Sequence, residues 1–157
     1  MSQNEAPEIG YRELRKGRFS ERNRIYHVTT RTHGYTPVFA SFGDARIVIQ
    51  ALYRQHLDGH LETLAFVVMP DHVHWLVQLV GDRDLSTCVN LVKSMATREI
   101  HRRGKYRGQV WQRGFHDRAM RKDDDLPSVA RYIVANPLRA GLVRSVRSYP
   151  FWDAKWL

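Results

Sequence analysis

Two histidines separated by one residue, His72 and His74, are the side chains of this sequence best placed to act together chemically. They lie in the run FVVMPDHVHWLVQL, whose β-branched and aromatic residues are typical of strands. Because alternate side chains of a strand point to the same face, the two imidazoles would stand side by side and could bind one metal ion. Histidines with this spacing also occur by chance on solvated strands, so the pair needs a third group to make a site.

A second pair, Tyr132 and Asn136, lies in the run ARYIVANP near the end of the chain. In a helix, residues four apart lie one above the other. A phenol can be a covalent nucleophile, and an amide oxygen one turn away can ligate a metal that positions the attacked group. The alternative interpretation makes Tyr132 an aromatic at the edge of the core and Asn136 the end of a helix before Pro137.

Hydrophobic periodicity and turn residues predict the elements that must position these side chains. Their order is strand, helix, strand, strand, helix, strand and a further helix, which is that of a split βαβ. We therefore expect an α+β fold, a ferredoxin-like antiparallel sheet with helices on one face and an extra C-terminal helix carrying Tyr132. The predicted strands cover residues 25–31, 64–69, 72–79 and 110–120, and the predicted helices cover 42–57, the segment from Leu85 to just before Gly104, and the segment from Leu126 to near Asn136.

The strand that begins at His72 has two different faces. Val73, Trp75, Val77 and Leu79 would share the face that packs against helices. His72, His74, Leu76 and Gln78 would share the other face, which can border an open site.

Length and charge narrow the function classes. The 157 residues suffice for one domain, which we place at residues 21–157 after a flexible basic arm at residues 1–20. Lys and Arg number 25 against 16 Asp and Glu, so the net charge of +9 favours a polyanionic partner, with nucleic acid ahead of a membrane.

A single cysteine, Cys88, excludes an intramolecular disulfide. With no signal-peptide pattern and no apolar run near the ~20 residues of a membrane span, we expect a cytoplasmic protein.

These residues carry a resemblance to a known family. The HVH strand after VMPD, together with the run YIVANPLRAGLV from Tyr132 to Val143, resembles the one-tyrosine HUH transposases. Within that superfamily the chain is most similar to the REP-associated tyrosine transposases. The runs WQRGFH, from Trp111, and YPFW, from Tyr149, fit the same pattern, so the resemblance covers roughly residues 20 to 152.

The resemblance implies a single-stranded DNA endonuclease and strand transferase that cleaves near hairpins and forms a 5′-phosphotyrosine. It places the nucleophile at Tyr132 and the metal ligands at His72, His74 and Asn136. In the insertion-sequence branch a glutamine stands one turn after the tyrosine, where this chain has Asn136. The resemblance points to Mg²⁺ or Mn²⁺, although imidazoles alone would also accept Zn²⁺. We favour a monomer over a homodimer.

Basic residues suggest where DNA would bind, although each of them could instead be an ordinary solvated charge. Phosphate contacts give affinity and position but do not reveal the target sequence. The candidates are Arg15, Lys16 and Arg18 in the arm and Arg102, Arg103, Lys105, Arg107, Arg113, His116, Arg118 and Arg121 in the domain. For His116 we prefer a structural role, and for Tyr149 that of a packing anchor.

Two other functions fit the same residues less well. A domesticated, non-catalytic regulator would bind hairpin DNA, and such a sheet would need exposed aromatics for base stacking. The predicted open face has His72, His74 and Gln78 instead. A small metal hydrolase would use Tyr132 as an acid or base and would form no covalent adduct with DNA.

Overall fold

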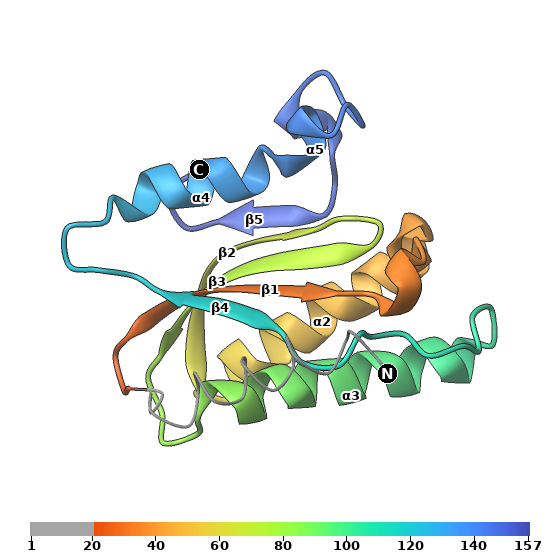
Figure 1. Cartoon of the computed structure of the whole chain (residues 1–157), viewed down its shortest axis with the longest axis horizontal. Helices are drawn as coiled ribbons and strands as arrows, with labels where there is room; N and C mark the ends of the chain where they lie inside the picture. Colours follow the sequence, from red (N-terminus) through yellow and green to blue (C-terminus); the bar gives the residue numbers. More distant parts are fainter. Residues whose placement is uncertain (1–20) are drawn as a thin grey trace, which may run out of the picture.

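An antiparallel sheet of five strands separates two layers of helices in the computed structural model, which describes residues 21–157 (Figure 1). The order of the strands across the sheet is β4-β1-β3-β2-β5. The predicted arm at residues 1–20, with Arg15, Lys16 and Arg18, lies outside the described residues. The strands are β1 (Ile25–Arg31), β2 (Leu61–Val68), β3 (His72–Leu79), β4 (His116–Ala119) and β5 (Trp152–Ala154), and the helices are α2 (Phe42–Leu57), α3 (Leu85–Arg103), α4 (Leu126–Val134) and α5 (Asn136–Arg139).

The predicted α+β, ferredoxin-like topology is confirmed. Helix α2 connects β1 to β2, and α3 connects β3 to β4, which gives the split βαβ arrangement. The edge strand β5, which pairs antiparallel with β2, was not predicted. Its three residues are too few to show the alternation by which a strand is recognised in a sequence.

The two long helices begin and end at residues suited to those positions. Ser41 caps α2 by accepting a hydrogen bond from the backbone N–H of Asp44, and Asp84 caps α3 in the same way through Thr87. Gly104 ends α3 in the left-handed conformation, with φ of +76°, which glycine adopts without steric cost. Both helices therefore follow the predicted boundaries.

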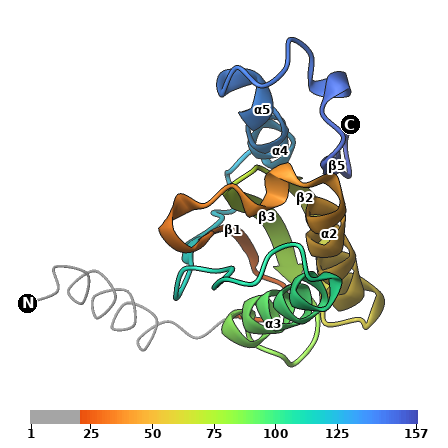
Figure 2. The same cartoon turned by 90° about the vertical axis from the view of Figure 1, so that its right-hand side faces the viewer.

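The main core lies between the sheet and the pair of helices α2 and α3, which run side by side (Figure 2). A small cavity in this layer is lined by Val73 and Trp75 of β3, Val48 of α2 and Val92 of α3. This face of β3 is the one predicted to pack against helices. The opposite face, with His72 and His74, is therefore turned away from α2 and α3.

Helix α4 covers part of that opposite face. It packs against β2, β5 and β3, and its Ala130 and Ile133 are fully buried (Figure 1). The side chains of β1 on this face, such as His27 and Thr29, remain only partly buried. The histidine pair thus lies where a covered part of the sheet meets a more open part.

Three predicted elements have wrong boundaries. The strand expected at residues 64–69 is β2, which spans Leu61–Val68. The expected strand at residues 110–120 is reduced to β4, because Gly114 turns the chain with φ of +76° and Trp111 makes only an isolated bridge to Thr32. The last helix ends at Val134, and Asn136 begins the separate short helix α5.

Among residues 21–157, no helix is both long and apolar enough to span a membrane.

Candidate active site

His72, the first residue of β3, is held by the turn that precedes it. Its Nδ1 lies 2.7 Å from the Oδ1 of Asp71, and the imidazole is 16% exposed. A carboxylate is a hydrogen-bond acceptor, so Nδ1 is the donor in this contact and Nε2 takes no part in it. This arrangement is typical of a histidine that binds a metal through Nε2.

His74 is held from the neighbouring strand. Its Nδ1 lies 3.0 Å from Nε2 of His27 and 3.2 Å from the hydroxyl of Thr29, both on β1. When Nδ1 of His74 is the donor in these contacts, Nε2 is left as the nitrogen that can bind a metal. The ring centroids of His72 and His74 are 5.0 Å apart, so the two imidazoles are neighbours, as their spacing predicts.

The surroundings keep His74 uncharged. Burial, together with the charges of His27, His72, Arg31 and Arg139, lowers the pKa of His74 to about 3. Burial and the charge of Arg118 also lower the pKa of His27. A neutral imidazole is the form that ligates a metal, so His74 is ready to bind one without first losing a proton.

Tyr132 lies on α4 with 60% of its surface exposed. The guanidinium carbon of Arg139 lies 3.9 Å from the centre of its ring. The charge of the same arginine acts on His74. Helix α4, which carries the phenol, packs against β3, which carries the histidine pair.

Asn136 directly follows the residue that joins α4 to α5. Its Nδ2 donates a hydrogen bond of 3.0 Å to the backbone oxygen of Ile133, which fixes the amide group. The side-chain oxygen of Asn136 is then the atom left to accept a hydrogen bond or to ligate a metal. The residue stands one turn after Tyr132, although on a separate helix.

These donors fit a divalent metal of the predicted kind. In the described part of the chain, His, Cys, Asp and Glu form no group of three or more that could hold a metal ion. A third protein ligand beside His72 and His74 would therefore have to be another type of donor, such as the oxygen of Asn136. Two imidazoles and an amide oxygen leave positions for water and phosphate oxygens, as a catalytic ion requires.

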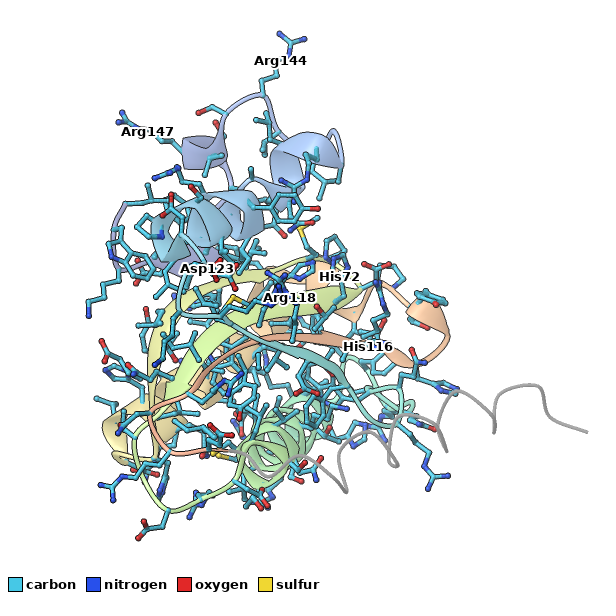
Figure 3. The ribbon with its side chains drawn as sticks, turned by 60° about the vertical axis from the view of Figure 1, so that its left-hand side comes forward. His72, His116, Arg118, Asp123, Arg144 and Arg147 are labelled. Carbon is cyan, nitrogen blue, oxygen red and sulfur yellow. The ribbon has the colours of Figure 1, made fainter. Side chains whose placement is uncertain are left out.

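The predicted DNA-binding residues fall into separate groups. His116 and Arg118 of β4 pair in register with Thr29 and His27, so they share the face of the histidine pair. Figure 3 shows His72, His116 and Arg118 on the side of the sheet that faces α4. Arg113 precedes β4, and Arg121 follows it beside a groove of about 640 Å³.

The other group belongs to the end of α3 and the loop after it, beyond the opposite face of the sheet. There Arg102 pairs with Glu99, and Arg103 lies 4.0 Å from the buried Asp44. Lys105 and Arg107 follow in the loop. These four residues therefore lie apart from Arg118, which shares the sheet face of the histidine pair.

Sequence reasoning missed His27, Arg139 and the role of Asp71. The sequence shows only that His27 lies on the strand predicted at residues 25–31. The register of β1 against β3 is what puts it beside His74. Arg139 stands seven residues after Tyr132, a helical spacing that Pro137 interrupts.

The expectation for Tyr149 is confirmed, because this residue is buried and donates to the backbone oxygen of Val68 at 2.6 Å.

Known proteins are similar to this chain in sequence and in fold. A relative from Haemophilus influenzae, named for the REP-associated tyrosine transposases, is 32% identical over 113 residues, which are 65% of this chain and 64% of that protein. The REP-associated tyrosine transposase of Escherichia coli K12 is 30% identical over 102 residues, 64% of this chain and 59% of that protein. The chain thus matches about three fifths of the length of these relatives.

A solved structure is also similar in fold. It is that of a REP-associated tyrosine transposase bound to a REP hairpin, with a TM-score of 0.73, 24% identity, and 86% of this chain and 79% of the other covered. The model of the family described as "Transposase IS200 like" matches residues 20–136, which include the histidine pair, Tyr132 and Asn136. The chain therefore belongs to the IS200-like transposase family.

Proposed function

We propose that this protein is a single-stranded DNA endonuclease and strand transferase that cuts near hairpins, with Tyr132 as its nucleophile. The observation that carries the proposal is the link between an exposed tyrosine and the histidine pair. Helix α4, which carries Tyr132, packs against β3, which carries the pair, and the guanidinium carbon of Arg139 lies 3.9 Å from the centre of the Tyr132 ring. Membership of a transposase family supports the same reaction class.

The reaction would be a phosphoryl transfer in two steps. The phenol oxygen of Tyr132 forms a bond to the scissile phosphorus while the bond to the 3′ oxygen breaks. The phenol proton leaves, and the departing 3′ oxygen takes up a proton to become a hydroxyl. The product is a 5′-phosphotyrosine, which a 3′-hydroxyl from another strand can attack in reverse, so joining needs no ATP.

Three side chains would hold the divalent metal of this reaction, which we propose to be Mg²⁺ or Mn²⁺. They are His72 and His74, each through Nε2, and Asn136 through its amide oxygen. When bound, such an ion neutralises charge on the scissile phosphate and makes the phosphorus easier to attack. Asp71, and His27 with Thr29, orient the two imidazoles for this role.

The proposed substrate is single-stranded DNA that contains a hairpin. A hairpin is what the solved relative of similar fold has bound. The net charge of +9 suits a phosphate backbone, and His116 and Arg118 lie on the face of the histidine pair. We propose that the protein acts as a monomer. Hairpin binding without cleavage would instead indicate a domesticated regulator.

The test is to trap the covalent intermediate. The protein is incubated with a single-stranded hairpin taken from DNA flanking its own gene, in the presence of Mn²⁺, and run on a denaturing gel. We expect a DNA adduct, and Tyr132→Phe should lower its yield at least ~100-fold, because phenylalanine lacks the attacking oxygen. Hairpin affinity should stay within about twofold, since the ring remains.

A matched control separates this effect from the loss of any exposed phenol. Tyr35 is 61% exposed, nearly the same as Tyr132, so Tyr35→Phe should leave the adduct yield unchanged. An adduct that persists in Tyr132→Phe would refute the assignment of the nucleophile. Cleavage that proceeds without any denaturation-resistant adduct would favour the metal hydrolase.

A further inference from the structure

We propose that Arg139 is a positioning residue that holds the ring of Tyr132 in place for its attack. This inference rests on the proposed function, because it assigns Arg139 a part in the attack by Tyr132. It depends on three observations: the stacking contact, the spacing along α4 and α5, and the packing of α4 against β3.

The stacking contact restrains a side chain that is otherwise free to move. Tyr132 is 60% exposed, so the core does not fix its ring. A guanidinium whose carbon lies 3.9 Å from the ring centre is well within the ~6 Å of a cation–π contact. The planar guanidinium covers one face of the ring and so limits the rotation of the phenol.

The spacing explains how Arg139 reaches the ring across a break between helices. Tyr132, Asn136 and Arg139 recur at i, i+4 and i+7, which is one face of a helix. The backbone keeps this helical sense, because Ala135 donates to Arg131 at 3.1 Å and Arg139 donates to Ala135 at 3.0 Å. The nucleophile, the proposed amide ligand and the arginine therefore follow one line along α4 and α5.

The packing of the helices relates the stack to the histidine pair. Helix α4, which carries Tyr132, packs against β3, which carries His72 and His74. Stacking uses the face of the guanidinium and leaves its in-plane N–H groups able to donate to phosphate oxygens. Arg144 and Arg147, by contrast, extend away from the sheet on the far side of α4 (Figure 3).

The kinetic test compares Arg139→Gln, Arg139→Lys and the control Arg144→Gln with the wild type. Single-turnover cleavage of the hairpin with Mn²⁺ gives the rate of adduct formation, and anisotropy gives the hairpin Kd. We expect Arg139→Gln to slow adduct formation at least ~10-fold while the Kd changes less than about threefold, because a misplaced nucleophile costs rate rather than binding. Arg139→Lys should recover only part of the rate, since it keeps the charge but loses the planar stack. Arg144→Gln should match the wild type.

Three outcomes would overturn the proposal: an unchanged rate in Arg139→Gln, a loss that lies wholly in the Kd, or full activity in Arg139→Lys. A second measurement needs no DNA. In NMR spectra the δ-methylene protons of Arg139 should be shifted upfield by the aromatic ring, and Tyr132→Leu should abolish that shift. If the wild type shows the upfield shift but forms no adduct, the proposed function fails while the stack stands; if the shift is absent, the positioning role fails whatever the adduct assay shows.

Discussion

The two histidines of β3 are supported in different ways. Asp71 holds His72 from the adjoining turn, whereas His27 and Thr29 hold His74 from another strand. Both arrangements occupy Nδ1 and leave Nε2 available. Orienting partners of this kind fix the tautomer and the ring direction of a metal-binding histidine. At the scale of single residues, His27 is thus the support that separates His74 from a histidine merely lying on a strand.

Replacing His27 should weaken metal binding without removing a ligand. We expect His27→Phe to lower the affinity for Mn²⁺ by about 10- to 100-fold, because the phenyl ring cannot hydrogen-bond to Nδ1 of His74. Titration calorimetry with Mn²⁺ and no DNA measures this directly. His27→Gln should recover part of the affinity, and His33→Gln, at an exposed position, should change nothing. Equal affinity in His27→Phe would show that His27 does not support the site.

At the scale of elements, α3 holds the segment that leads into β4. Nζ of Lys93 donates to the backbone oxygens of Gln112, at 3.0 Å, and Gly114. The indole N–H of Trp111 donates in turn to the backbone oxygen of Lys93 at 3.2 Å. These contacts fix the turn before β4 and so the strand that carries His116 and Arg118.

The half-buried Lys93 should make stability depend on pH. Burial lowers the pKa of Lys93 from its ordinary 10.5 to about 8. Between these values the unfolded chain keeps the proton that the folded chain has lost, so raising the pH stabilises the fold; below about 8 both states are protonated and the cost of burying the charge is fully present. Urea unfolding across this window should show that rise in the wild type and a smaller one in Lys93→Met. Cys88 is present in both proteins, so its contribution cancels when the two curves of stability against pH are compared. Parallel curves for the wild type and Lys93→Met would contradict this expectation.

At the scale of the whole molecule, some of the basic side chains already lie beside acidic side chains of the protein, which lowers their attraction for DNA. The chain carries +9, but Arg102 is paired with Glu99 and Arg103 lies near Asp44. Arg118 lies on the face of the histidine pair. A DNA strand that reaches the proposed site would therefore meet Arg118 before it meets the end of α3.

This distribution predicts how hairpin binding responds to salt. Each phosphate that a cation neutralises contributes about 0.7 to 0.9 to the slope of log affinity against log salt concentration. We expect Arg118→Gln to reduce the slope by about 1 and Arg102→Gln to reduce it by much less, because Glu99 already offsets that charge. Fluorescence anisotropy between ~50 and ~200 mM salt measures both slopes. Equal slopes in the two variants would place the DNA elsewhere.

The sequence by itself determined most of the elements and the faces of β3. Periodicity predicted the boundaries of α2 and α3 and the two faces of β3, and Gly104 marked the end of α3. These features are local, because they depend on residues within a few positions of one another. The roles of His72, His74, Tyr132 and Asn136 came from a resemblance and stay predictions.

Only the tertiary structure decided which residues from distant segments meet. The register of β1 against β3 brings His27 to His74, 47 residues away, and a one-residue slip would have turned His27 to the other face. The turn from α4 into α5 brings Arg139 to the ring of Tyr132, and α4 itself packs against the strand of the histidine pair. Such contacts depend on pairing and packing between segments, which no local pattern specifies. The sequence therefore determined the chemical groups, and the fold decided how they support one another.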